Sequence, residues 1–250
     1  MQLKKLIGSK HFYRVLLAVS IPIMIQNGIS NFINLLDNVM VGRLGTEQMS
    51  GVSIVNQLFL VFNLCIFGAV SGAGLFSAQF FGKGDLDGLR HAFRFKWYMT
   101  LVLFALAMAA FLCAGEPLIR LYLHSGSETG DLELTLHYAK QYMALMLVGL
   151  LPYTVTQIYA SSLRETSRSL PPMLAGAAGV LVNLSLNYVL IFGKLGLPAL
   201  GVRGAALATV ISRFVECGSL ILWTHLHKRE YSFIKGAYRS LYVPRPLVKS

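Results

Sequence analysis

The hydrophobic residues of this chain are gathered into six long runs that short polar segments separate. The runs cover about 14–37, 51–80, 95–114, 134–161, 170–192 and 204–226. Each run is long enough to cross a bilayer as a helix, which takes about 20 residues. The runs lack the strict alternation of apolar and polar residues that is typical of membrane strands. The pattern therefore predicts an all-α integral membrane protein with six transmembrane helices.

Polar residues recur along the first run at helical spacing. On a helical wheel of 100° per residue they fall within one arc of about 140°. They are Gln26, Asn27, Ser30, Asn31, Asn34, Asp37 and Asn38. Polar groups in a membrane span are costly unless they face protein or water. We therefore expect this face, with Gln26, Asn27, Ser30 and Asn34, to line a cavity of the bundle.

Asp37 is the acid of this polar face and has no basic residue within one turn of its own helix. A carboxylate in a membrane span indicates a functional site. Two ligands fit an acid surrounded by amides: a proton, or Na+ held by hard oxygens of Asp, Asn, Thr and backbone carbonyls. Both are coupling ions of transporters. The sequence has no nucleophile–base set, phosphate loop or metal-ligand cluster, so we expect no enzyme, no cofactor and no metal beyond Na+.

Charge changes the picture in two ways. The chain has a net charge of +11, but only 13% of its residues are charged, against about 25% in soluble domains. The basic residues are spread over short loops rather than one face, which argues against nucleic-acid binding. Sixteen of the 22 lysines and arginines, Lys96 among them, are assigned to one side of the membrane. We therefore expect a multi-pass protein of the cell membrane. By the positive-inside rule both of its termini are on the cytoplasmic side.

The sixth run contains two charged residues of opposite sign. Arg213 and Glu216 are three positions apart, and each alone would be costly in a membrane span. We expect them to offset each other as an intramembrane charge pair, which serves either the structure or a charge relay.

Four stretches resemble the multidrug and toxic compound extrusion (MATE) family, and the resemblance extends over essentially the whole chain. They are IPIMIQNGISNFINLLDNVMVGRLG (21–45), SAQFFGKGD (77–85), SSLRETSRSLPPM (161–173) and NLSLNYVLIFGKLGLPALGVRGAALATVISR (183–213). The resemblance implies twelve helices in two six-helix lobes. It also implies efflux of cationic, amphipathic compounds in exchange for Na+ or H+.

The resemblance also implies roles for single residues. Pro22 matches the proline at which the first helix of the family bends, and Asp37 matches the acid of its N-lobe cation site. Asn183 and Thr209 match an asparagine and a threonine of that site. Asn187 stands where many members carry a second aspartate. An amide cannot exchange a proton at physiological pH, which leaves Asp37 as the one acid of the site.

Only six helices are predicted, so residues 1–226 correspond to the N-terminal lobe and 227–250 to a basic cytoplasmic linker. The other lobe would come from the rest of a longer chain, from a separately encoded half or from a second copy related by a two-fold axis. We expect a secondary-active antiporter, or its N-terminal half, which acts in the lipid bilayer on cationic small molecules.

Two alternatives remain for the function. One is a non-transporting remnant or a partner-binding membrane subunit. The other is a related lipid or polymer flippase, which the single arginine and the lack of a lysine well inside the predicted spans disfavour.

Overall fold

A computed structural model describes residues 10–126, 131–228, 230–231 and 233–234. These residues form seven α-helices, which the structure places with the following bounds: α1 Lys10–Gly42, α2 Thr46–Lys83, α3 Leu86–Gly126, α4 Leu132–Val148, α5 Leu150–Glu165, α6 Leu170–Phe192 and α7 Val202–Leu226.

The described helices agree with the six predicted spans. Five of them are long and apolar enough to cross a membrane, and α4 with α5 gives a sixth span that is bent by 46°. The bend was not predicted. Pro152 has no backbone N–H and its ring crowds the carbonyl four residues earlier, which interrupts a helix. The interruption falls at Gly149, so the predicted helix 134–161 is two helices.

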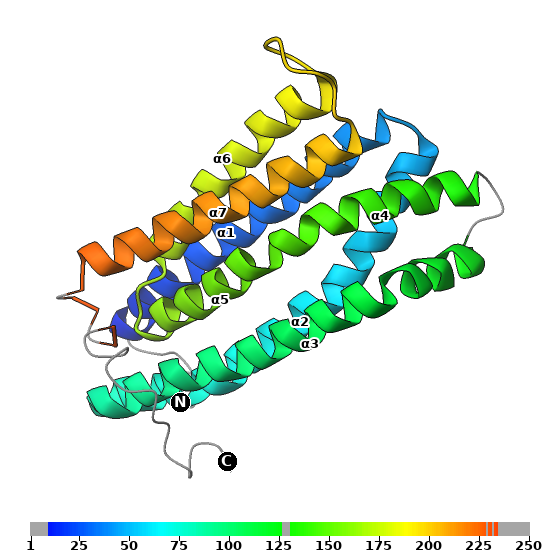
Figure 1. Cartoon of the computed structure of the whole chain (residues 1–250). Helices are drawn as coiled ribbons and strands as arrows, with labels where there is room; N and C mark the ends of the chain where they lie inside the picture. The colour runs from blue at the N-terminus through cyan, green and yellow to red at the C-terminus, as the bar shows by residue number, and fades with distance from the viewer. Residues whose placement is uncertain (1–9, 127–130, 229, 232, 235–250) are drawn as a thin grey trace, which may run out of the picture.

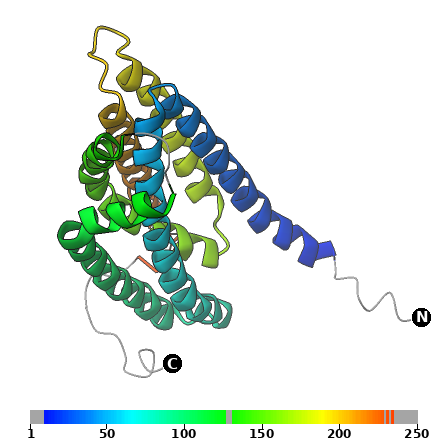
Figure 2. The same ribbon diagram turned by 90° about the vertical axis from the view of Figure 1, so that its right-hand side faces the viewer.

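The helices lie side by side in one bundle (Figure 1). The first turn of α1, the α2–α3 and α5–α6 connections and the last turn of α7 share one end of the bundle. The connections α1–α2 and α6–α7 lie at the other end. This agrees with the predicted grouping of loops on two sides. Figure 2 shows that the first half of α1 leans away from the other helices. None of the described side chains in its apolar window Phe12–Ile29 is buried.

The buried side chains form two apolar clusters. The larger one joins α2 to α3, α4 and α7 around Phe59, Ile66 and Met146. The smaller one packs Phe93 of α3 against Tyr159 of α5. Phe233, which follows α7, also contacts Phe93, with the ring centroids 5.3 Å apart. The start of the predicted linker therefore packs on the bundle, and most of 227–250 lies outside the described residues.

A glycine sets the close approach of α6 and α7. A Cβ atom on Gly204 would lie 2.5 Å from the carbonyl oxygen of Leu190. Such contacts require a small residue at a helix interface in a membrane. The short distance brings the polar residues of α6 next to those of α7.

Candidate functional site

A chain of hydrogen bonds joins three helices at the predicted ion site. The Asn187 amide nitrogen donates to Asp37 Oδ1 at 2.5 Å and to Asn183 Oδ1 at 3.1 Å. The Asn183 amide nitrogen donates to Thr209 Oγ1 at 3.2 Å, and the Thr209 hydroxyl donates to the Ala205 carbonyl. The structure thus brings together all four residues that the sequence assigned to the ion site, from α1, α6 and α7.

A cavity of about 300 Å³ lies beside this chain. Its polar lining residues are Asp37, Asn38, Asn56, Asn63, Tyr142, Thr209 and Arg213, and its apolar ones are Val41, Val52, Phe59, Leu60, Met146 and Ala205. Asn183 and Asn187 do not line the cavity and are almost wholly buried. Their hydrogen bonds hold Asp37 and Thr209 in place at the wall of the cavity.

The oxygen atoms of this site fit a hard cation in type. Asn187 Oδ1 is buried and has no hydrogen-bond partner within the described residues. The Asp37 carboxylate and the Thr209 hydroxyl lie in the same hydrogen-bonded group. A carboxylate, an amide oxygen and a hydroxyl are ligands that Na+ takes in transporters. The carboxylate alone could equally take a proton.

Arg213 lines the cavity from α7 and lies within electrostatic range of Glu216, its predicted partner, but not in direct contact with it. None of the ion pairs between described residues joins these two side chains. Arg213 donates to the Gly149 carbonyl at 3.3 Å and lies over the Tyr153 ring at 5.3 Å. Glu216 instead packs on α6 at Gly179, where an added Cβ would lie 3.1 Å from its own Cβ. The partners of Arg213 lie where α4 meets α5.

The remaining predicted residues of α1 do not share one environment. Gln26 donates to the Pro172 carbonyl of α6 at 3.3 Å and accepts from Arg164 of α5 at 2.9 Å. Asn27 and Asn31 are exposed. The side chains of Ser30 and Asn34 lie outside the described part of the structure.

Among the described side chains of this polar face, those of Asp37 and Asn38 line the cavity beside the hydrogen-bonded group. The helical wheel treats α1 as evenly packed, whereas its first half leans away from the bundle. Pro22 lies within a continuous helix, and its role as a hinge stays a prediction.

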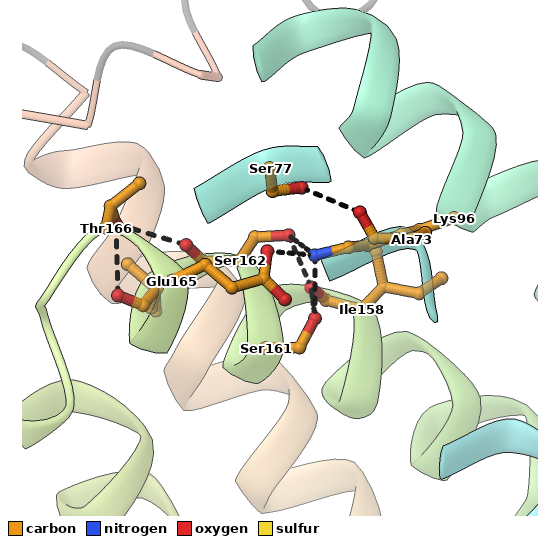
Figure 3. Close-up of polar contacts among 9 residues, drawn as sticks. Ala73, Ser77, Lys96, Ile158, Ser161, Ser162, Glu165 and Thr166 are labelled. Atoms are coloured by element: carbon orange, nitrogen blue, oxygen red, sulfur yellow. Dashed lines mark hydrogen bonds and ion pairs between the residues drawn. The ribbon is translucent and has the colours of Figure 1, made fainter. Parts of the chain in front are cut away.

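A second polar cluster was missed by sequence reasoning (Figure 3). Lys96 of α3 is wholly buried and donates to the hydroxyls of Ser161 and Ser162 at 2.9 and 3.2 Å. It also forms an ion pair with Glu165, at the end of α5. Lys96 lies at the start of the third predicted run, where its burial could not be read from the sequence.

Comparison with known proteins agrees with the resemblance. The MatE family model matches residues 22–189. A probable multidrug resistance protein NorM of Thermotoga maritima is 29% identical over 222 residues, which is 88% of this chain and 46% of that protein. A probable NorM of Bacillus subtilis is 28% identical over 246 residues, 96% of this chain and 51% of that protein. The chain spans about half the length of the curated relatives it matches.

Solved structures support the same fold. A crystal structure of MATE in the bent conformation has a TM-score of 0.81 and 24% sequence identity, with 95% of this chain and 50% of that chain covered. A MOP superfamily transporter from Pyrococcus furiosus has a TM-score of 0.80, with 94% and 49% covered. Since the family model matches more than half of its residues, this multi-pass membrane chain belongs to the MatE family.

Proposed function

We propose that this chain is one lobe of a secondary-active exporter of cationic, amphipathic drugs, with Asp37 as the site of the coupling ion, Na+ or H+. The observation that carries the proposal is the hydrogen-bonded group of Asp37, Asn183, Asn187 and Thr209 beside a cavity. Family membership and relatives named as multidrug resistance proteins support it.

In this proposal the charge of Asp37 controls the attachment of α1. As a carboxylate, Asp37 accepts a strong charge-assisted hydrogen bond from Asn187, which ties α1 to α6. A proton or a metal ion on Asp37 weakens that bond. The first half of α1 is not buried, so α1 can then move and change the shape of the cavity. Drug and coupling ion favour different positions of α1, and each therefore lowers the affinity for the other.

The exposed amides of α1 support a partner for this lobe. Asn27 and Asn31 are exposed although they lie in a membrane-spanning helix, where polar groups need protein or water beside them. A complementing lobe or a second copy of this chain meets that need. The half-length match to the relatives supports the same arrangement.

Dye efflux tests the proposal. Cells that express the chain with its complementing half are loaded with a cationic dye, and efflux is measured by fluorescence. Asp37→Asn removes the charge but keeps the shape, and we expect efflux to fall to background. The matched control is Asp87→Asn, whose side chain is 80% exposed in a surface ion pair with Arg90, and this variant should retain efflux. Full efflux by Asp37→Asn would show that Asp37 is not the coupling site.

A further inference from the structure

The cavity carries one charge of each sign. Asp37 reaches it from α1 and Arg213 reaches it from α7. The two do not form an ion pair within the described residues, but both act electrostatically on the Tyr142 hydroxyl of α4. Asp37 and Arg213 therefore share the lining of the cavity without a direct ion pair between them.

Arg213 is held in this position by neutral groups. Its partners are the Gly149 carbonyl and the Tyr153 ring. A guanidinium stays charged under all physiological conditions. Arg213 also lies one helical turn after Thr209, so both project from the same face of α7. A cation that binds between Asp37 and Thr209 would thus meet the field of Arg213.

The charges of the site sum to zero. Position 187 is an amide, so Asp37 supplies the one negative charge of the lining and Arg213 the one positive charge. Behind the lining, Glu216 lies within electrostatic range of both Arg213 and Arg164. Counted with these two further charges, Asp37, Arg213, Glu216 and Arg164 again sum to zero. A neutral lining binds Na+ weakly, because the free energy that the ion loses on dehydration is not offset by attraction to a net negative charge.

The size of the effect follows from Coulomb's law. A sphere of about 300 Å³ is about 8 Å across. Two unit charges about 8 Å apart, in an effective dielectric of about 20, change a binding constant by about 30-fold. That factor is large enough to decide whether a weakly bound ion such as Na+ occupies the site.

We propose that Arg213 makes the Asp37 site exclude Na+, by supplying inside the lobe the positive charge that a coupling metal ion would otherwise bring. This inference rests on the proposed role of Asp37 as the coupling site, and it names the residue that selects the ion. Arg213 acts here as a specificity-determining residue, through its charge.

Equilibrium binding of radioactive Na+ to the purified 250-residue chain in detergent tests this without any transport step. Potassium chloride keeps the ionic strength constant. The Arg213→Gln variant loses the charge but can still donate to the Gly149 carbonyl, and we expect it to bind Na+ about 30-fold more tightly than the natural chain. Arg213→Lys keeps the charge and should bind Na+ as weakly as the natural chain.

A second variant makes the site more negative without a change at Arg213. Asn187→Asp adds a second acid in contact with Asp37, behind the lining, and makes the site net negative, so it should also gain Na+ binding. Equal Na+ affinities of the natural chain and both charge-changing variants, or an equal gain in Arg213→Lys, would overturn the inference.

The failure of this inference can be separated from failure of the proposed function. If Arg213→Gln gains Na+ binding and keeps it when Asp37→Asn is added, the ion does not bind at Asp37, and the inference about Arg213 is wrong. The proposed function also allows a proton at Asp37, and the efflux of Asp37→Asn decides it separately. If the natural chain binds Na+ in an Asp37-dependent way and Arg213→Gln does not change it, only the role of Arg213 is wrong.

Discussion

At the scale of single residues, the glycines of α2 give a sharp test of its packing. Gly74 faces the Glu165 carboxylate of α5, and an added Cβ atom would collide with it. Glu165 cannot simply turn away, because it pairs with the buried Lys96. We expect Gly74→Ala to lower the free energy of unfolding by about 1–3 kcal/mol, as overpacking typically does. Thermal unfolding of the purified chain in detergent, followed by tryptophan fluorescence, measures this.

The neighbouring Gly72 provides the matched control for this substitution. A Cβ on Gly72 would have no atom within 4 Å, and alanine favours a helix over glycine by about 1 kcal/mol. Gly72→Ala should therefore unfold no earlier than the natural chain. Equal losses in both variants would contradict the packing of Gly74 against Glu165.

The same segment shows what a motif cannot decide. The spacing of Gly68 and Gly72 is typical of two helices in close contact, yet both glycines face open space in this chain, and Gly74 makes the contact. All three positions look equivalent in the sequence. Only the position of α5 determines which face of α2 needs the small residue.

At the scale of helices, the ion pair of Lys96 and Glu165 joins α3 to α5 (Figure 3). Lys96→Met removes the cation and leaves a poorly solvated carboxylate, whose side chain is 14% exposed. Loss of one partner of a buried pair costs about 3–5 kcal/mol, and we expect a loss at the lower end of that range. Addition of Glu165→Gln should restore much of the stability, because it removes the unpaired charge.

A surface pair serves as the control for this experiment. Lys140 pairs with Glu116 at 2.5 Å, with side chains that are 51% and 39% exposed. Exposed pairs contribute little to stability, so Lys140→Met should leave the unfolding temperature almost unchanged. Similar losses in Lys96→Met and Lys140→Met would mean that burial does not set the strength of the inner pair.

The helices themselves could be predicted from the sequence, because long apolar runs leave few alternatives to a membrane-spanning helix. Their ends and bends could not. Pro152 and Gly149 break one run, although Pro22 and Pro117 lie inside unbroken helices. Whether a helix breaks depends on what its neighbours can bond and fill.

At the scale of the whole molecule, the proximity of the four predicted residues could be anticipated, because they recur at helical spacing and match a family pattern. Asn183, Asn187, Thr209 and Asp37 meet as expected. The place of Arg213 could not be predicted, because the Gly149 carbonyl and the Tyr153 ring that it contacts belong to the neighbouring helices α4 and α5 and not to α7. The tertiary fold decides which groups a long side chain contacts, and its neighbours in the sequence do not determine those contacts.

The orientation of the bundle follows from charge and can be tested on the whole chain. Most basic residues are assigned to the end that holds the α5–α6 connection, so this end should face the cytoplasm. After the exposed Cys65 and Cys113 are replaced by alanine, a cysteine at Arg168 should react with a membrane-impermeant maleimide only in permeabilised cells. A cysteine at Lys194, in the α6–α7 connection, should react in intact cells. The reverse pattern would mean that the chain has the opposite orientation in the membrane. Labelling of both sites in intact cells would mean that the charge bias does not fix one orientation.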